Sequence, residues 1–213
     1  MLKKRIIFTL LYCEGFFVLS RNFNLQKIGN IDWLLNNYNF DNISNYIDEI
    51  IILDISRENK NRNKFLKDVN KLIKKCFIPI TLGGGVNKFE LAQELLSSGA
   101  DKILLSTSVF ENKSLINEIS TNYGDQSIII NLDYKKINNN YFLFKNNGFE
   151  KLEINLNIFF KNLVKFKFGE LILNSITNDG TGMGLDVGIL ELIPKNFIKP
   201  LIISGGVGNY RHI

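Results

Sequence analysis

The sequence contains few residues of the kinds that form disulfides and metal sites. Its 213 residues include only two cysteines and one histidine. Cys13 and Cys76 lie far apart, and neither has a neighbour at the spacing of metal ligands. This pattern excludes a disulfide framework and favours a reducing compartment. We expect a protein that uses no metal and no cofactor.

Long apolar runs are also missing. The N-terminal stretch MLKKRIIFTLLYCEGFFVL has the basic start and apolar continuation of a signal peptide. However, Glu14 and Gly15 interrupt the run, and no small-residue cleavage site follows. No other stretch approaches the length that crosses a membrane. We therefore expect a cytoplasmic protein without a membrane partner.

The basic residues form no continuous stripe. The net charge is +5 and the pI is near 9.1, which would permit nucleic-acid binding. The lysines, however, are spread over the expected helices and turns and are not interleaved with exposed aromatic residues. We expect a solvated lysine-rich surface and no nucleic-acid partner.

Short apolar runs recur in the same order in the two halves of the sequence. The matched segments, 121 or 122 positions apart, are 49–56 with 170–177, 79–86 with 200–207, and 5–11 with 127–133. Such runs, separated by helical patterns, are typical of parallel strands buried on both faces. The sequence predicts an α/β fold, a (β/α)8 TIM barrel with a two-half repeat. The alternative is an open doubly wound sheet.

Seven strands are expected, at residues 5–10, 49–53, 78–82, 102–105, 127–132, 171–174 and 200–203. The expected helices cover residues 63–75, 88–98 and 157–166, with others ending near Ile47, ending before Gly124 and beginning at Asp186. A long loop follows the first strand, and a hairpin is expected around 141–149.

The repeat implies an eighth strand near position 102 + 121 = 223, beyond Ile213. We therefore expect residues 1–213 to form a single barrel domain truncated after strand seven, with strand eight and the last helix missing.

Glycine-rich turns follow several of the expected strands. Turns of this kind at the carboxyl ends of parallel strands can hold an anion. Two such sets are expected at one mouth of the barrel, which implies an elongated substrate phosphorylated at both ends. The alternative is that the glycines only form tight turns. The two sets are Gly83, Gly84 and Gly85 with Ser106 and Thr107, and Asp179, Gly180 and Thr181 with Gly205 and Gly206.

Asp133 follows the fifth expected strand and is the best acid-base candidate between these turns. The equivalent position in the first half is 11, where an aspartate would complete a pair of carboxylates. The residue there is Leu11. Asp54 is a further carboxylate at the mouth. It either substitutes in part for the missing acid or anchors the loop that follows it.

Four charged residues stand at the first positions of expected strands: Arg5, Glu49, Lys102 and Glu170. Charges near a barrel axis persist only when they are paired. We therefore expect a ring of two cations and two anions that closes the bottom of the barrel and gates a small polar molecule. The alternative is that each charge is simply solvated.

Several motifs together resemble the cyclase subunit of imidazole glycerol phosphate synthase. They are MLKKRII, LGGGV, ADKILLSTS, the DYK turn that begins at Asp133, LILNSITNDGTGMGLD and ISGGVGN. The resemblance runs nearly end to end and implies a lyase of histidine biosynthesis within a glutamine amidotransferase complex. In that family a glutaminase subunit docks on the barrel as a heterodimer and releases ammonia. The ammonia passes a salt-bridge gate to a doubly phosphorylated small-molecule substrate, where two aspartates run cyclisation and cleavage.

The resemblance also implies residue roles. It makes Asp133 catalytic and places Asp101 in the glutaminase-docking surface. It assigns the ammonia gate to Arg5, Glu49, Lys102 and Glu170, and the phosphate sites to Gly85, Ser106, Thr107, Asp179, Gly180 and Gly206.

Three positions depart from the pattern of the family. Leu11 stands where the second catalytic aspartate is expected, Leu19 replaces a lysine of the first loop, and Ser106 replaces an asparagine. The gate residues are intact. This asymmetry, with the LLYCEG start and the long first loop, is similar to a divergent branch that channels ammonia to a sugar-modifying amidotransferase in surface-polysaccharide acetamidino synthesis.

We therefore expect an ammonia-dependent synthase subunit that serves acetamidino-sugar modification. Two alternatives stay open. The first is a genuine cyclase subunit of histidine biosynthesis, in which Asp54 or a shifted group replaces the missing acid. The second is a non-catalytic scaffold or ammonia conduit that binds the glutaminase and the sugar-modifying proteins.

Overall fold

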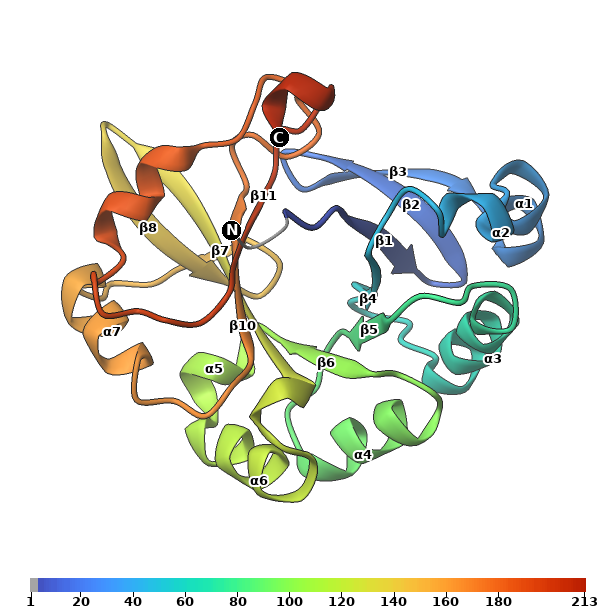
Figure 1. Cartoon of the computed structure of the whole chain (residues 1–213), viewed down its shortest axis with the longest axis horizontal. Helices are drawn as coiled ribbons and strands as arrows, with labels where there is room; N and C mark the ends of the chain where they lie inside the picture. The colour runs from blue at the N-terminus through green and yellow to red at the C-terminus, as the bar shows by residue number, and fades with distance from the viewer. Residues whose placement is uncertain (1–3) are drawn as a thin grey trace. The chain divides into compact units, whose positions relative to one another are not determined.

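The computed structural model describes residues 4–213 and has an α/β fold. The chain divides into two compact units. Unit 1 comprises Leu25–Leu104 together with the described residues up to Leu19, and unit 2 comprises Ser20–Asn24 and Leu105–Ile213. The α-helices and most of the strands of both units are labelled in Figure 1.

Unit 1 contains four parallel strands, which neighbour one another in the order β1, β4, β5, β6. Their side chains are mostly isoleucine and leucine, and Ile50, Ile52, Leu82 and Ile103 are completely buried. These runs are too short for helices and are apolar on both faces, which favours a covered parallel sheet. The bounds are Ile7–Cys13 for β1, Glu49–Asp54 for β4, Ile80–Gly83 for β5 and Lys102–Leu105 for β6.

Helices connect these strands. The α3 helix begins after Asn61, whose side chain accepts a hydrogen bond from the backbone of Lys64, and it buries Phe65, Val69 and Leu72 at helical spacing. This confirms the helix expected over residues 63–75. The helices of unit 1 are α1 (Ile31–Asn37), α2 (Phe40–Ile43), α3 (Arg62–Ile73) and α4 (Phe89–Ser97).

The first strand is longer than expected, and the segment after it is not an open loop. The expectation of a strand over residues 5–10 was wrong because β1 continues to Cys13, where it pairs antiparallel with β2 (Phe16–Arg21). Glu14 and Gly15 make the turn with φ angles of 50° and 90°. The strand β3 (Asn24–Gly29) then leads into α1.

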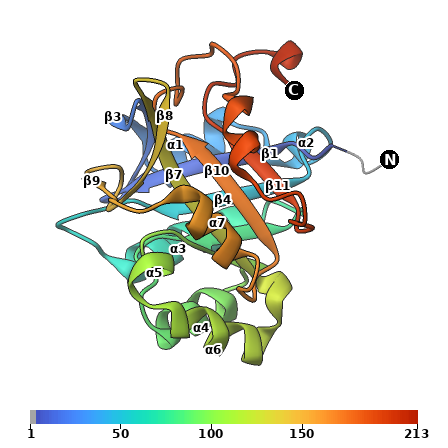
Figure 2. The same ribbon diagram turned by 90° about the vertical axis from the view of Figure 1, so that its left-hand side faces the viewer.

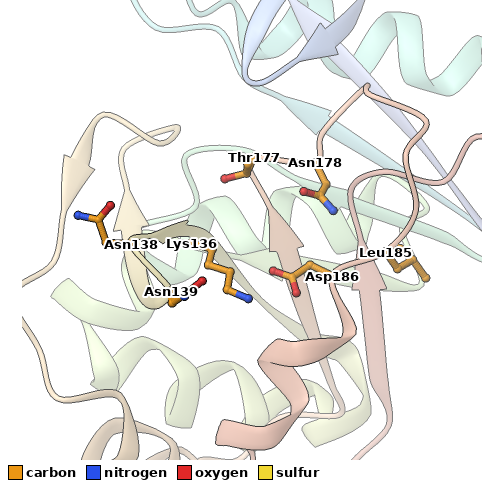
Figure 3. A pocket seen from close by; sticks show the side chains of 7 residues that line it. All are labelled: Lys136, Asn138, Asn139, Thr177, Asn178, Leu185 and Asp186. Carbon is orange, nitrogen blue, oxygen red and sulfur yellow. The ribbon is translucent and has the colours of Figure 1, made fainter.

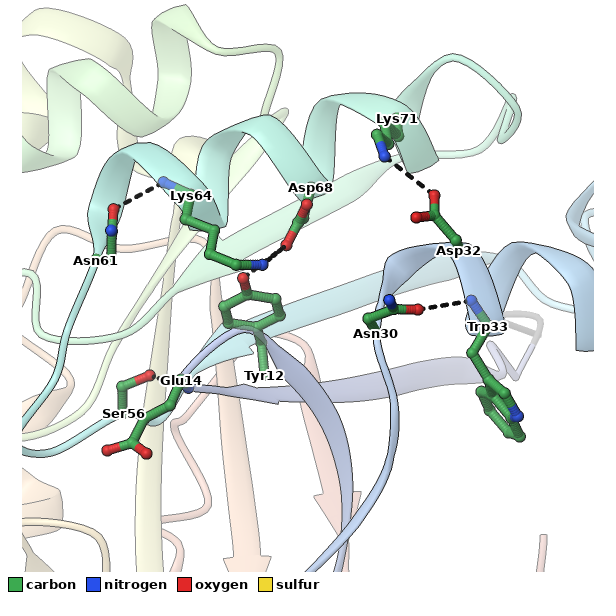
Figure 4. A network of polar contacts seen from close by, with 10 residues as sticks. All are labelled: Tyr12, Glu14, Asn30, Asp32, Trp33, Ser56, Asn61, Lys64, Asp68 and Lys71. Carbon is green, nitrogen blue, oxygen red and sulfur yellow. Dashed lines mark hydrogen bonds and ion pairs between the residues drawn. The ribbon is translucent and has the colours of Figure 1, made fainter.

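A buried polar network holds β1 against α3 in unit 1. The Tyr12 hydroxyl donates to Asp68 Oδ2 at 2.7 Å, and Lys64 Nζ donates to the same oxygen at 2.9 Å. Figure 4 shows the three side chains converging, with Ser56 receiving the backbone N–H of Glu14 nearby. Burial and the Asp68 carboxylate raise the pKa of Tyr12 well above its ordinary value. The hydroxyl is therefore a permanent donor.

Replacing Tyr12 with phenylalanine is expected to lower the free energy of unfolding by about 1–2 kcal/mol, because buried Asp68 loses one of its two donors. The measurement is urea denaturation at neutral pH. Tyr46→Phe is the control, since Tyr46 is 72% exposed. Equal stability of the two variants would show that the Tyr12 hydrogen bond contributes nothing.

Unit 2 is built around three parallel strands, β7 (Ile128–Ile137), β10 (Glu170–Ser175) and β11 (Leu201–Ser204). The β8 strand (Asn140–Lys145) returns antiparallel along β7 and pairs with the two-residue β9 (Glu150–Lys151). Figure 2 shows β7, β8 and β10 from the side. The helical elements are α5 (Ser108–Glu111), α6 (Lys113–Tyr123), η1 (Asp125–Ser127), α7 (Leu156–Leu163), η2 (Val187–Leu192) and η3 (Tyr210–His212).

The hairpin expected around residues 141–149 is confirmed, but the strand before it was placed too short. The β7 strand runs past residue 132 to Ile137 because β8 pairs with its second half. Asn138 and Asn139 form the turn with φ angles of 48° and 62°, which asparagine tolerates better than most residues. Asp133 thus lies within a strand and not after one. The helix expected from Asp186 is a 3-10 helix.

Within residues 4–213, no helix is long and apolar enough to cross a membrane. The single closed barrel, the repeat of its halves and the missing eighth strand stay predictions.

Candidate functional site

Asp133 is a nearly buried carboxylic acid among the parallel strands of unit 2. It lies in β7, directly beside Asn174 of the parallel strand β10. Its Oδ1 accepts hydrogen bonds from Asn131 Nδ2 at 3.0 Å and from Asn174 Nδ2 at 2.8 Å. Ser106 provides a further side-chain hydrogen bond. The residue is only 7% exposed. Two amides and a hydroxyl therefore fix the orientation of a nearly buried carboxyl group.

The protonation of Asp133 is set by two opposing effects. Burial raises its pKa above the ordinary value, and the charge of Asp179 acts in the same direction. The hydrogen bonds from Asn174, Asn131 and Ser106 lower it, but burial is the larger effect. A carboxyl group with a raised pKa and donors ready to stabilise its ionised form can both give and take a proton.

Asp179 begins the DGT segment of unit 2, and the end of β2 with the turn between β2 and β3 holds it. Its Oδ2 accepts hydrogen bonds from Ser20 Oγ at 2.6 Å and from the Phe23 backbone N–H at 3.1 Å. The Asn22 backbone N–H donates to the Asp179 carbonyl at 2.9 Å. Sequence reasoning did not indicate this contact, because residues 20 and 179 are far apart in the chain.

The remaining glycines of the expected second phosphate set lie at crowded turns. Gly206 has a φ of 100°, and a Cβ there would lie 2.1 Å from the Gly184 carbonyl oxygen. The Gly184 N–H donates to the Gly206 carbonyl at 2.7 Å, which ties the two loops together. A Cβ on Gly180 or Gly205 would likewise lie within 2.5 Å of a backbone oxygen. Packing alone thus requires these glycines, and their role in phosphate binding stays a prediction.

The hydroxyl groups of the other expected ligands already have partners. Thr181 Oγ1 donates to the Asn178 carbonyl at 2.7 Å. Thr107 Oγ1 accepts a hydrogen bond from the Asn146 backbone N–H at 3.1 Å, in the turn between β8 and β9. These contacts position the loops. Phosphate binding by Ser106, Thr107 and Thr181 stays a prediction.

A polar cleft of about 540 Å³ opens beside the DGT segment of unit 2. Figure 3 shows Lys136 and Asp186 pointing toward its centre. Asp186 Oδ1 accepts a hydrogen bond from the Tyr141 hydroxyl at 3.0 Å. Burial, together with this carboxylate, raises the pKa of Tyr141 to about 12. One cation, one anion and several amides can hydrogen-bond a hydroxylated ligand. The lining residues are Lys136, Asn138, Asn139, Thr177, Asn178, Leu185 and Asp186.

In unit 1, the turn after β5 contains the other expected glycines. Gly84 has a φ of 117°, and a Cβ there would lie 2.1 Å from the Asp54 carbonyl oxygen. Gly85 has a φ of 66°, and a Cβ there would lie 2.7 Å from Lys60 Nζ. The turn is therefore pressed against the end of β4 and the loop that follows it.

Replacing Gly84 with alanine is expected to destabilise unit 1 by about 2–4 kcal/mol, because the new methyl group meets backbone and the φ angle is left-handed. Gly99→Ala is the control. Gly99 has a similar φ of 104°, but its nearest neighbour would be the end of Ile73 at 3.5 Å. Urea denaturation measures both variants, and a loss in G84A no larger than in G99A would contradict the close approach to Asp54.

Three of the four charges expected at strand starts meet in unit 1, although Arg5 precedes β1, which begins at Ile7. Glu49 is 2% exposed and accepts hydrogen bonds from Lys102 Nζ at 2.7 Å and from Thr81 Oγ1 at 2.5 Å. Arg5 Nη1 lies 3.6 Å from the same carboxylate. The expected pairing of these three charges is confirmed, and Thr81 is an addition. Glu170 begins β10 of unit 2 and is buried. The complete ring and its gating role stay predictions.

Comparison with known proteins gives the same family throughout. The histidine biosynthesis protein family matches residues 32–213. A protein of Parasynechococcus marenigrum, provisionally named imidazole glycerol phosphate synthase subunit hisF2, is 43% identical over the whole chain and 79% of its own length. The imidazole glycerol phosphate synthase subunits HisF of Chlorobium phaeovibrioides and Chloroherpeton thalassium are 36% and 35% identical over the whole chain and 84% of their own lengths. The chain belongs to the histidine biosynthesis protein family and, within it, to the HisF subunits, which are called the HisF family below.

Leu11 stands where the family pattern described in the sequence analysis has the second catalytic aspartate. Leu11 lies in β1 beside Leu53 of β4 and Val18 of β2, and it is half-buried. A hydrocarbon side chain takes no part in proton transfer. Asp54 lies one residue further along β4, is buried, and accepts the Ser56 backbone N–H with its Oδ1. This contact matches the loop-anchoring role considered for Asp54.

Asp101 also has a partner within this HisF-family chain. Its Oδ2 accepts the Ile80 backbone N–H at 2.8 Å, and its own N–H donates to the Ile80 carbonyl at 2.8 Å. Asp101 therefore fixes the start of β5, whereas its role in glutaminase docking stays a prediction. Sequence reasoning missed Asn131 and Asn174, although amides within runs of isoleucine and leucine are a detectable signal.

Proposed function

We propose that the chain is the synthase subunit of a glutamine amidotransferase complex, in which it uses ammonia from a glutaminase partner to modify a phosphorylated small molecule. The observation that carries the proposal is Asp133. A nearly buried carboxyl group with a raised pKa, held by two amides and a hydroxyl, is suited to proton transfer. Membership of the HisF family supports the same reaction class.

In the proposed reaction, protonated Asp133 donates its proton to an oxygen of the substrate as a bond to that oxygen breaks. The carboxylate that remains is stabilised by the hydrogen bonds from Asn131 and Asn174. As the ammonia nitrogen forms its bond to the substrate carbon that loses this oxygen, the carboxylate removes a proton from the nitrogen, which returns Asp133 to its starting state. The glycine-rich turns hold the phosphate groups of the substrate during both steps.

The charged cluster of unit 1 supports the ammonia route. Glu49 is buried, and its charge is compensated by Lys102 and Arg5. Breaking a buried pair of this kind costs several kcal/mol, so the cluster persists in the resting protein. We assign this cluster of Arg5, Glu49 and Lys102 to the gate through which ammonia enters.

For the molecule that accepts the ammonia nitrogen, we favour a sugar that undergoes acetamidino modification over the substrate of histidine biosynthesis. Leu11 removes one of two acid-base groups, so cyclisation by the usual pair of aspartates is lost. The polar cleft beside the DGT segment has the amide and carboxylate lining that suits a sugar. The second candidate is a histidine-pathway cyclase in which Asp54 supplies the missing acid, which the burial of this carboxylate at the end of β4, the strand paired with β1, favours.

The test is a complex reconstituted from the full chain, its glutaminase and the sugar-modifying amidotransferase, with incorporation of ¹⁵N into the acceptor as the readout. The nitrogen is supplied either as amide-labelled glutamine or as ammonium. Lys102→Met is expected to lower glutamine-driven incorporation and leave ammonium-driven incorporation unchanged, with exposed Lys75→Met as the control. Equal loss with both nitrogen sources would contradict the gate. Undiminished incorporation with Asp133→Asn would show that the chain acts only as a scaffold.

A further inference from the structure

Two tyrosines of the hairpin formed by β7 and β8 hold Asp186 in unit 2. The Tyr134 hydroxyl donates to the Asp186 carbonyl at 3.2 Å, and the Tyr141 hydroxyl donates to Asp186 Oδ1 at 3.0 Å. The two rings meet edge to face, with their centroids 5.7 Å apart. Gly188 leaves room for this contact, because a Cβ there would lie 2.6 Å from the Tyr141 hydroxyl oxygen. Both the backbone and the side chain of Asp186 are therefore fixed.

The second carboxylate oxygen of Asp186 is left for a ligand. Asp186 is the N-cap residue of η2, a position at which an aspartate often caps the first turn, but its side chain makes no capping hydrogen bond. Within the described residues of unit 2, Oδ2 accepts no hydrogen bond and takes part in no ion pair. Figure 3 shows the carboxylate directed into the polar cleft. One oxygen is thus anchored, and the other faces the cleft.

Lys136 faces the same cleft from β7. Its Nζ lies over the Tyr141 ring, 5.2 Å from the ring centroid. Among residues 4–213 it has no carboxylate within the distance of an ion pair, although Asp186 lines the same cleft. Figure 3 shows the ammonium and the carboxylate both pointing toward the space between them. A cation and an anion therefore share the cleft without neutralising each other.

These separated charges select the chemistry of the ligand. A hydroxyl group both donates and accepts hydrogen bonds, so neighbouring hydroxyls of a pyranose ring can bind the Asp186 carboxylate and the Lys136 ammonium at once. A phosphate is repelled by the carboxylate, and an amine is repelled by the ammonium. The other polar lining residues are neutral, which also favours a neutral ligand rich in hydroxyl groups. They are Asn138, Asn139, Thr177 and Asn178.

We propose that the cleft binds the pyranose ring of the acceptor, with Asp186 and Lys136 as the residues that recognise a pair of neighbouring hydroxyl groups. Tyr141 is the positioning residue, because it holds Asp186 Oδ1 and lies beneath Lys136. The inference rests on the proposed function, in which the acceptor is a sugar. It adds the side chains that select this sugar.

The test is an NMR titration of the ¹⁵N-labelled full chain with N-acetylglucosamine and, separately, with galactose. Both are neutral pyranoses with neighbouring hydroxyls, and the Asn178 amide resonance reports on the cleft. Binding is expected to weaken about tenfold in Asp186→Asn and in Lys136→Met, because each variant loses a charged hydrogen bond. The matched controls are Glu153→Gln and Lys161→Met, which remove exposed charges elsewhere in unit 2 and are expected to bind as the wild type does.

Tyr141→Phe tests the positioning role. It is expected to weaken sugar binding about threefold in the wild-type chain, because Asp186 is no longer held. In an Asp186→Ala background it is expected to have no further effect, since no carboxylate is left to position. An equal loss in both backgrounds would show that Tyr141 supports only the fold of the hairpin.

No response of the Asn178 amide to either sugar in the wild type would overturn the proposal, as would equal binding by the Asp186→Asn and Lys136→Met variants and their controls. Tighter binding of free glycine, whose ammonium and carboxylate also match the two charges, would contradict it by assigning the cleft to a zwitterion. The titration needs neither glutaminase nor ammonia. Sugar binding without ¹⁵N incorporation therefore contradicts the proposed function alone, whereas incorporation without a response at the cleft contradicts this inference alone.

Discussion

Replacing Asp133 with asparagine is expected to lower ¹⁵N incorporation into the acceptor by about a hundredfold or more, the usual contribution of a general acid or base. Asparagine has the same shape and keeps a side-chain oxygen for the hydrogen bonds from Asn131 and Asn174, but it carries no transferable proton. The loss should appear with glutamine and with ammonium alike. Initial rates with both nitrogen sources measure it.

The stability of D133N distinguishes a catalytic loss from a folding defect. Burial raises the pKa of Asp133 in the folded protein. The contribution of Asp133 to folding stability is therefore complete below its unfolded-state pKa of about 3.9, and it is lost as the pH rises through the folded-state pKa. The asparagine of D133N does not ionise, so the stability of this variant does not fall for that reason. We therefore expect D133N to gain stability relative to the wild type as the pH rises across this range, in urea denaturation. Asp32→Asn on the exposed face of α1 is the control, and it is expected to leave the rate unchanged. A D133N protein that is unfolded at neutral pH would contradict this account of the site.

Replacing Leu11 with aspartate is expected to raise ammonium-driven ring formation from the histidine-pathway intermediate by about a hundredfold over the wild type, because the change restores the second acid-base group. The position is half-buried in β1, so the new carboxyl group can still be solvated. A cost of about 1–3 kcal/mol in unfolding free energy is expected from the lost apolar contacts and the partly buried carboxyl group.

Leu11→Asn is the matched control for this experiment. It has nearly the shape and polarity of aspartate but cannot transfer a proton, so it should carry the same stability cost without the gain in rate. Equal ring formation by L11D and L11N would show that the acid missing at position 11 is not what separates this chain from the cyclases.

The strands that form the cores of both units were predictable from sequence, whereas their ends were less so. After Glu49, the run at residues 50–53 is apolar throughout, and β4 is buried along nearly its whole length. The extensions of β1 and β7 depend on antiparallel partners that the sequence does not announce. In each case asparagine or glutamate in a left-handed conformation makes the adjoining turn, at Glu14, Asn138 and Asn139.

The residues around Asp133 were predictable only in part, because some of them come together only in the folded sheet. Asp133 was singled out because it directly follows an apolar run that predicts a buried strand. Its amide partner Asn174 becomes visible only through the parallel register of β7 and β10. In the polar cleft, Lys136 and Asp186 could not be singled out, because in the segments KKINNN and GLDVG they look the same as solvated charges. Their approach to the same cleft depends on the folded path of the chain.

The central claim is that this member of the HisF family retains ammonia chemistry at Asp133 but has lost the cyclisation that needs an acid at position 11. The most direct test is the initial rate at which the wild-type chain, supplied with ammonium salts, forms the ring from the histidine-pathway intermediate. We expect a rate at background level. Turnover at the rate of a HisF cyclase would contradict the claim.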